Sequence, residues 1–265
     1  NVKGADPQMS GELSTHGLER LLDGYGIEMA KDMIQDLGHE AEMSFSTSTG
    51  STVKLRLPGV LVVKHDDAAQ PSAQPLDTSF VPFFRLDEVV LPFASSLLLH
   101  PEKQPGARLT PVARSSPLAM SFTSGPLLLN PTRAQVPRGD PGPRILAAAL
   151  EGKIKSAFAG RPGEGVSAPE SAPEDSRLFV LSAAQFPVNP LARAANPPPP
   201  SDPMAMLGPV PTDEELAMMA QPYAQKYLTT TILALKNTLD WAAADDATVS
   251  CSALLVNEAK DAKPR

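Results

Sequence analysis

Proline is the residue that most restricts what this chain can fold into, because 29 of its 265 residues are proline. A proline fixes its own φ and lacks the amide that helices and sheets use for hydrogen bonds. Many of these prolines lie in three segments that carry few large apolar residues, 130–144, 160–177 and 193–211. Such segments bury too little surface to offset their ordering entropy. We therefore expect long surface loops within a single domain, residues 1–256, followed by a solvated tail, residues 257–265.

The overall balance of residues excludes several classes of protein. With 42% hydrophobic residues the chain is globular and can bury a sizeable core. The net charge of −7 and the lack of a Lys/Arg cluster with interleaved aromatics argue against nucleic acid as a partner. A single cysteine excludes an intrachain disulfide. The longest apolar run, residues 89–99, is about half the roughly 20 residues that a spanning helix needs, so we expect any signal or anchor to lie outside this sequence.

Several short segments have the pattern of β-strands. Residues 42–49 and 52–57 alternate apolar and polar side chains, which predicts strands with one wet face. Residues 59–64 are uniformly apolar and predict a central strand, and residues 177–181 predict a strand covered on both faces. Residues 145–158 fit either an alanine-rich helix or a hairpin. We favour the hairpin because Glu151 and Gly152 interrupt the run and Ile154 then alternates with lysines.

Two segments predict helices. Leu18, Leu21 and Leu22 line one face of a helix that ends near Asp23, where Gly24 and Gly26 favour a left-handed cap. This helix reads as the second half of a strand–helix–strand unit whose first half is not visible in the sequence.

The second helix lies near the C-terminus. Thr212 and Glu215 form a capping box, and Pro222 predicts a break or bend. Beyond the proline, an apolar stripe steps by four, three and four residues, which predicts a core-facing surface: Leu228, Ile232, Leu235 and Leu239. Residues 248–256 then predict a final strand.

The sequence predicts no catalytic residue, metal site or cofactor site. His65, Asp66 and Asp67 form a His–carboxylate cluster, but adjacent residues rarely point at one centre, so a solvated loop is favoured over a metal site. No Gly-x-Ser/Cys-x-Gly elbow or phosphate-binding loop is present in the sequence. Cys251 lies within the predicted final strand and is interpreted as a small buried hydrophobe.

One position keeps a ligand-binding hypothesis. In doubly wound α/β proteins, ligands bind beyond the carboxyl ends of the strands. Ser182 and Gln185 follow the predicted strand 177–181 and would line such a cleft. The alternative, which the general pattern favours, is a polar turn that caps the strand.

Five blocks of the sequence resemble the extracytoplasmic domain of the gliding-motility-associated, GldG-like family of ABC transporter auxiliary proteins. The blocks are residues 16–36, 89–99, 145–158, 176–186 and 235–265, and the most specific parts are the leucine-rich helix running into Tyr25–Ile27 and the run Asn237–Trp241. The resemblance implies an α/β fold, a Rossmann-like three-layer sandwich with a mostly parallel sheet, whose first strands would lie upstream of residue 1. Where the family tends towards a glycine and acidic residues, this chain has Ser182, Ala183 and Gln185.

The resemblance also implies a location and partners. It places the domain on the extracytoplasmic, periplasmic face of the bacterial inner membrane, anchored through flanking segments, with an ABC permease and ATPase as partners and no enzymatic activity. We therefore expect a non-enzymatic auxiliary or ligand-binding domain of an ABC transport system. An amidotransferase-like or hydrolase-like enzyme on the same fold is the first alternative. An adaptor that uses the proline tract 197–200 in polyproline II form is the second.

Overall fold

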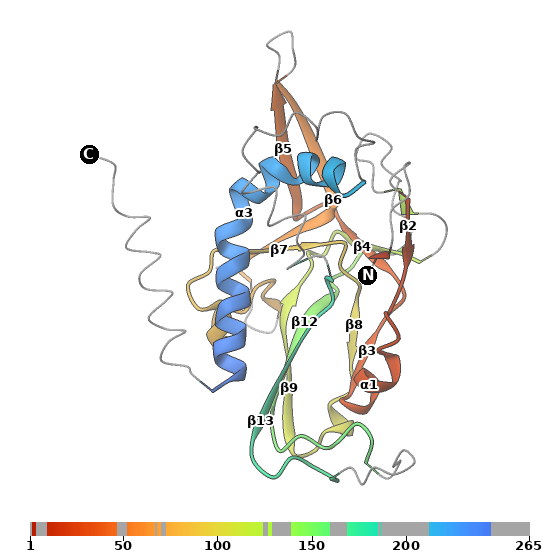
Figure 1. The fold of residues 1–265 in the computed structure, drawn as a ribbon, viewed down its shortest axis with the longest axis vertical. Coiled ribbons are helices and arrows are strands. Elements are labelled where there is room, and N and C mark those ends of the chain that lie inside the picture. Colours follow the sequence, from red (N-terminus) through yellow and green to blue (C-terminus); the bar gives the residue numbers. More distant parts are fainter. Residues whose placement is uncertain are drawn as a thin grey trace, which may run out of the picture.

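The computed structural model describes residues 2–3, 10–46, 52–66, 68–69, 73–123, 127–128, 139–159, 169–184, 186 and 212–244. The element order is that of a mostly β protein with one long helix (Figure 1). Every strand pair in these ranges is antiparallel. The prediction of a Rossmann-like α/β sandwich with a mostly parallel sheet is therefore wrong.

The largest sheet has five strands, arranged around the alanine-rich strand β12 (Ile145–Gly152). β12 pairs along its length with β13 (Ser176–Leu181) on one side and with β9 (Ala107–Arg114) on the other. β8 (Leu97–Leu99) joins β12 at Ile145 and continues the sheet to β3 (Ile27–Met29). The predicted strand at 145–152 is thus confirmed, but its antiparallel partner is β13, not residues 153–158.

A second sheet is built from β5 (Glu40–Ser46), β6 (Thr52–Lys64) and β7 (Glu88–Pro92). The first half of β6 pairs with β5, and the second half, Val60 to Lys64, pairs with β7. The strands predicted at 52–57 and 59–64 are therefore two halves of one strand. The second half is the central, buried part, as its uniform apolarity predicted.

Two smaller sheets complete the β-structure of the described ranges. β4 (Met33–Asp36) pairs with β10 (Ala119–Phe122). β2 (Ser10–Leu13) pairs with both β1 (Val2–Lys3) and β11 (Leu127–Leu128). Three helical segments are short: α1 (Glu19–Gly24), η2 (Val81–Phe83) and η3 (Pro101–Lys103).

The alanines of β12 separate two hydrophobic cores. Ala147 and Ala149 contribute to the larger core, which also contains Leu61, Val63 and Leu91 of the second sheet. Ala148 contributes to the smaller core with Leu22, Ile27, Met29, Leu97 and Val180. A strand buried on both faces reads as a continuous apolar run whether its neighbours are parallel or antiparallel, which is why the apolar runs of this sequence suggested a parallel sheet.

Helix α1 packs against β3 through Leu22, whereas Leu18 is 40% exposed. Gly24 approaches the turn after β12 so closely that a Cβ there would lie 2.5 Å from the Cα of Ala157. Gly26 has φ +75°, the left-handed conformation that the sequence predicted. The helix therefore has a sheet partner within the chain, and no upstream strand is needed to explain its buried face.

Two buried aspartates connect β4 to other parts of the chain. The Asp32 carboxylate accepts hydrogen bonds from the backbone N–H and the hydroxyl of Ser96, at 2.8 and 2.7 Å. The Asp36 carboxylate does the same with Ser116, at 2.7 and 2.5 Å, and also accepts the N–H groups of Gly38 and His39. Because both carboxylates are buried, these hydrogen bonds replace the water that each charge loses on folding.

The long helix α3 (Thr212–Ala242) begins where the sequence predicted and runs along one side of the molecule (Figure 1). Its light-blue first part lies at a steep angle to the rest. The helix includes Pro222, and a proline within a helix commonly bends it. The buried residues of its second part are Tyr227, Ala234, Asn237 and Trp241. The stripe predicted as core is instead largely exposed, with Ile232 at 54%, Leu235 at 37% and Leu239 at 62%.

An aromatic cluster fixes α3 to the sheets. The ring of Trp241 lies 5.1 Å from that of Phe80, edge to face, and Phe80 stacks on Phe179 of β13 at 5.9 Å. Phe83 packs edge to face on both phenylalanines. The Arg177 guanidinium covers the Trp241 ring at 5.3 Å and donates a 2.7 Å hydrogen bond to the Trp241 carbonyl.

β13 is less buried than the sequence predicted. Only Val180 of its six residues is fully buried, and the others are half-buried. β13 is an edge strand, with β12 on one side, and α3 contacts it. The prediction of a strand covered on both faces is therefore wrong for most of its length.

We expect Trp241→Ala to lower the free energy of unfolding by about 3–5 kcal/mol, because it removes a fully buried ring from the aromatic cluster. Leu118→Ala is the control: Leu118 is 57% exposed, so its truncation should change stability by less than about 0.5 kcal/mol. Urea unfolding followed by far-ultraviolet circular dichroism measures both. Equal effects of the two substitutions would contradict the anchoring role of Trp241.

A second prediction concerns pH. Burial raises the pKa of the Glu40 carboxyl, and the Arg56 guanidinium, whose Nε lies 3.0 Å from Glu40 Oε1, opposes this shift. A raised pKa means that the folded state binds the proton more tightly than the unfolded state, so protonation of Glu40 adds stability as the pH falls from neutral towards the unfolded value near 4.5.

The Glu40→Gln variant cannot take up this proton, because its side chain has no carboxylate. We therefore expect the unfolding free energy of the wild type to increase relative to that of Glu40→Gln as the pH is lowered from about 7 to about 4. Urea unfolding at several pH values measures the difference. Glu42→Gln, on the same strand but with a side chain that is 49% exposed, is the control and should show a smaller change. A difference in unfolding free energy between the wild type and Glu40→Gln that stays constant with pH would count against a raised pKa of Glu40.

Candidate functional site

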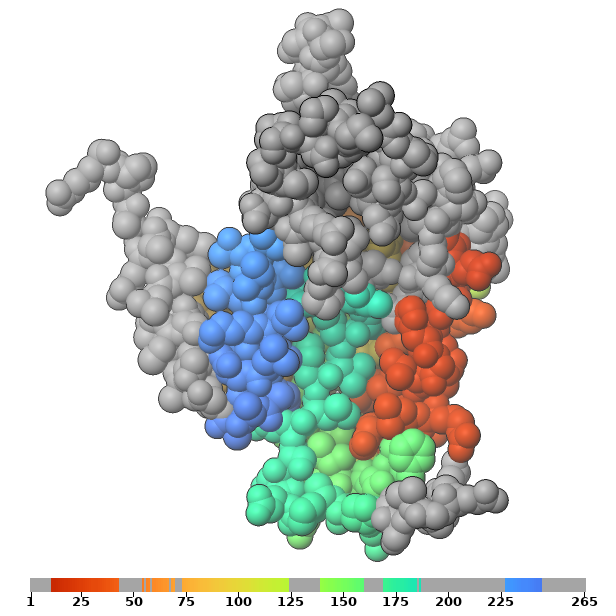
Figure 2. All heavy atoms as spheres, in the orientation of Figure 1, coloured from red at the N-terminus to blue at the C-terminus, as the bar shows by residue number. Residues whose placement is uncertain are grey.

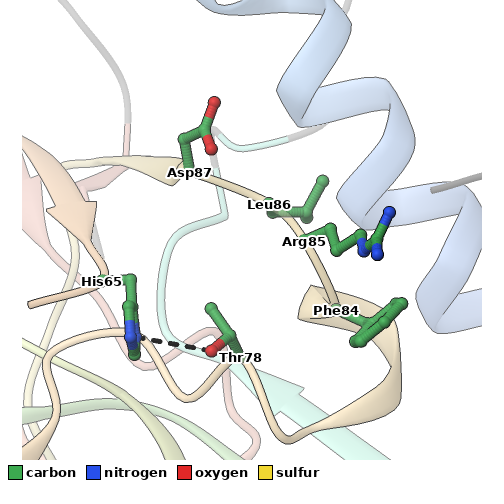
Figure 3. A pocket seen from close by; sticks show the side chains of 6 residues that line it. All are labelled: His65, Thr78, Phe84, Arg85, Leu86 and Asp87. Atoms are coloured by element: carbon green, nitrogen blue, oxygen red, sulfur yellow. Dashed lines mark hydrogen bonds between the residues drawn. The ribbon is translucent and has the colours of Figure 1, made fainter. Parts of the chain in front are cut away.

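A shallow depression lies beside η2, with a volume of about 260 Å³. Its lining consists of His65, Thr78, Phe84, Arg85, Leu86 and Asp87. In Figure 3, His65 and Thr78 face each other across one end, and Phe84 and Arg85 lie towards α3. The residues come from the end of β6, the loop before η2 and the segment that leads into β7.

The His65 ring is held by its neighbours. Its Nδ1 lies 3.2 Å from the carbonyl oxygen of Leu76 and 3.4 Å from the hydroxyl of Thr78. Asp66 does not join it: the Asp66 carboxylate accepts the backbone N–H of Ala68, and Gln74 bonds to the Asp66 backbone. Asp67 lies outside the described residues. Within the described ranges, no three His, Cys, Asp or Glu side chains come close enough to hold a metal ion.

Phe84 and Arg85 form an exposed wall of the depression. Phe84 is 38% exposed, and the Arg85 guanidinium lies 5.4 Å from the centre of its ring. Arg85 has φ +58°, a left-handed conformation that costs energy for a residue with a Cβ. The hydrogen bonds that close the η2 turn hold it there, since the amides of Phe84 and Leu86 donate to the carbonyls of Val81 and Phe83.

The chemistry of this depression favours recognition of an apolar or aromatic group. An exposed ring beside a guanidinium is the composition found at the centres of protein interfaces. In the sequence His65 stands out as part of a His–carboxylate cluster, whereas Phe84 and Arg85 do not. The only signal in the sequence was an arginine between aromatic and apolar residues, which is too common to identify a site.

Ser182 lies elsewhere, at the end of β13. Its side chain is buried, its hydroxyl donates a 2.9 Å hydrogen bond to the carbonyl of Leu146, and its amide donates to the same oxygen. Its carbonyl accepts the amide of Ser95. This geometry is that of a residue that ties β13 to β12 and to the connection between β7 and β8. Gln185 lies outside the described residues, so the ligand-binding hypothesis for this pair stays a prediction.

Other residues singled out in the sequence also lie outside the described ranges. These are Cys251, the predicted strand 248–256 and the proline tract 197–200. Among the helices that the structure describes, none combines the length and the apolarity needed to span a membrane.

The fold and the depression together define a mostly antiparallel β protein with an aromatic-lined surface beside its long helix. Residues 2–206 match the protein family described as an ABC-type uncharacterized transport system, and the chain belongs to this family. Membership indicates an auxiliary component of an ABC-type transport system that associates with transporter components. No curated protein and no solved structure matches the chain.

We expect glycine to be tolerated better than alanine at position 85, because glycine adopts a positive φ without a steric penalty. Arg85→Gly should be more stable than Arg85→Ala by about 1 kcal/mol. At the exposed Arg108 of β9 the order should reverse, since glycine weakens an ordinary strand. Thermal or urea unfolding of the four variants measures both pairs. An alanine variant that is the more stable at both positions would show that Arg85 carries no backbone strain.

Proposed function

We propose that this protein is a non-enzymatic auxiliary domain that binds the permease and ATPase assembly of an ABC transport system. The observation that carries the proposal is the family match over residues 2–206. The resemblance of five sequence blocks to GldG-like proteins supports a role related to gliding motility. It also supports a location on the extracytoplasmic face of the bacterial inner membrane, with anchoring through flanking segments of the full-length protein.

The depression beside η2 is the surface that we assign to this contact. Its exposed Phe84 ring and the adjacent Arg85 guanidinium offer an apolar surface with a cation at its edge. Loss of a central aromatic residue commonly weakens a protein complex by 2 kcal/mol or more, about a factor of 30 in affinity. The depression is shallow and its walls are mainly apolar, which suits a side chain of a protein partner better than a small polar substrate.

An enzyme remains the less supported alternative. The amidotransferase-like or hydrolase-like interpretation depended on a Rossmann-like fold, and the antiparallel sheets remove that basis. In the depression, His65 Nδ1 lies 3.2 Å from the Leu76 carbonyl oxygen and 3.4 Å from the Thr78 hydroxyl.

The test is affinity purification of the tagged full-length protein from detergent-solubilised membranes. We expect the permease and ATPase subunits to co-purify with it, and we expect Phe84→Ala to weaken their binding at least tenfold in a titration with the purified transporter. Leu118→Ala, which also removes an exposed apolar side chain, is the matched control and should bind as the wild type does.

Two outcomes would contradict the proposal. Recovery of the full-length protein in the soluble fraction without transporter subunits would overturn the transporter role. Retention of full affinity by Phe84→Ala, with co-purification intact, would leave the role standing and remove the depression as the contact surface.

A further inference from the structure

Asn237 is a buried amide on the inner face of α3, a face that is otherwise mainly apolar. In Figure 2 the blue surface of α3 forms one side of the molecule, next to the teal surface of β13. Asn237 lies on the inward side of this helix with none of its surface exposed, between Ala234 and Trp241 one turn away on either side. Burial of an amide in apolar surroundings is unfavourable unless hydrogen bonds replace those it made to water.

Only one end of the Asn237 amide has a partner in the described part of the chain. Its Nδ2 donates a 3.2 Å hydrogen bond to the carbonyl oxygen of Pro82. Its Oδ1 is buried and accepts no hydrogen bond from any described residue. A buried amide that is satisfied at one end adds little net stability, because the unpaired oxygen offsets much of what the paired nitrogen contributes. The specific consequence of an asparagine here is therefore the link to Pro82.

Pro82 lies at the centre of η2, so this hydrogen bond joins the turn to the helix. The backbone hydrogen bonds that shape the turn are internal to it: the amides of Phe83, Phe84 and Leu86 donate to the carbonyls of Phe80, Val81 and Phe83. The carbonyl of Pro82 instead accepts a donor from α3. Because proline has no amide of its own, its carbonyl is the backbone polar group through which this residue can be held.

The aromatic cluster also holds η2 against α3, but it sets the position of the turn less narrowly. Phe80 packs edge to face on Trp241, and such pairs are favourable over ring-centre separations of about 4.5–7 Å. A hydrogen bond weakens steeply once its length or angle leaves a much narrower range. The cluster therefore determines which faces meet, and the bond from Asn237 to Pro82 narrows where the turn sits on the helix.

The exposed wall of the depression begins two residues after Pro82. Phe84 and Arg85 continue the backbone of η2, and in Figure 3 both lie on the side of the depression nearest α3. Their cation–π contact, 5.4 Å from the guanidinium to the centre of the ring, joins these two exposed residues to each other. A displacement of the turn would therefore carry both groups with it.

We propose that Asn237 is a positioning residue for the partner-binding depression. Its bond to the Pro82 carbonyl holds η2 at one place on α3, and this sets the position of Phe84 and Arg85 before a partner arrives. A surface that is already ordered loses less conformational freedom on binding and so binds more tightly. The consequence for binding rests on the proposed function, whereas the ordering of the turn does not.

Hydrogen exchange measures the ordering of the turn without any partner. Asn237→Leu keeps a branched side chain and removes the donor. In the full-length protein we expect the amides of Phe84 and Leu86 to exchange about tenfold faster in this variant, while the amides of the central strand β12 keep their wild-type rates. Thr238→Val is the matched control: it removes the 2.7 Å hydrogen bond from the Thr238 hydroxyl to the Ala234 carbonyl within α3, and it should change neither set of amides.

Titration with the purified permease and ATPase complex measures the effect on binding. We expect Asn237→Leu to weaken binding about fivefold and Thr238→Val to leave it unchanged. A positioning residue acts through the wall, so Asn237→Leu should weaken binding by about twofold or less in a Phe84→Ala background, where the ring to be positioned is absent. A residue that only stabilises the fold would weaken binding by the same factor in both backgrounds.

Three results would overturn the proposal. Wild-type exchange rates for Phe84 and Leu86 in Asn237→Leu would show that the bond does not hold the turn. An affinity that is unchanged by Asn237→Leu, although the wild type binds, would show that the ordering of the turn does not serve binding. Equal losses in the wild-type and Phe84→Ala backgrounds would show that Asn237 does not act through the wall.

The two measurements separate this inference from the proposed function. If the wild-type protein does not bind the transporter, the proposed function fails, and the exchange rates by themselves decide whether Asn237 orders the wall. If far-ultraviolet circular dichroism shows that Asn237→Leu does not fold, Asn237→Ala removes the same donor without adding volume. The same changes in exchange and affinity are then expected of Asn237→Ala, and wild-type values would overturn the proposal.

Discussion

The aromatic cluster of Phe80, Phe83, Phe179 and Trp241 is the interaction on which the arrangement of this molecule depends. It joins three segments that are far apart in the chain: the η2 turn, the edge strand β13 and the end of α3. Aromatic rings bury a large area and prefer defined edge-to-face geometries, so the cluster sets both the position and the rotation of α3. The rotation determines which side chains face the sheets and which face outward.

The rotation of α3 also accounts for the stripe that the sequence placed in the core. Leu228, Ile232, Leu235 and Leu239 have the spacing of a buried face, and they are the strongest apolar pattern in the helix. The inner face instead combines Tyr227, Ala234, Asn237 and Trp241, of which the asparagine is polar and the alanine small. A hydropathy pattern cannot rank these two faces, because it does not contain the cavity shape into which Trp241 fits or the carbonyl of Pro82 that pairs with Asn237.

The candidate site lies on the irregular backbone that connects β6 to β7, outside the strands themselves. The buried carboxylates of Asp32 and Asp36 hold β4 against Ser96 and Ser116. The η2 turn packs on the C-terminal part of α3, and its strained neighbour Arg85 follows it. Binding surfaces are often built on loops supported in this way. In the proposed role, this surface is the contact for the transporter partner, and the sheets present it.

The sequence by itself determined the positions of many elements: the strands at 52–64 and 145–152, the start of α3 at Thr212 and the left-handed Gly26. These follow from local rules, since alternation, capping and positive φ act over a few residues. The resemblance in five blocks also led to the correct broad family. Only the tertiary structure decided that the strands pair antiparallel, that β13 lies at an edge, that Phe84 and Arg85 share a wall with His65, and that the leucine stripe of α3 faces outward. Those features depend on contacts between residues tens to more than a hundred positions apart, and such contacts are set by how whole side chains fit together and not by the local order of apolar and polar residues.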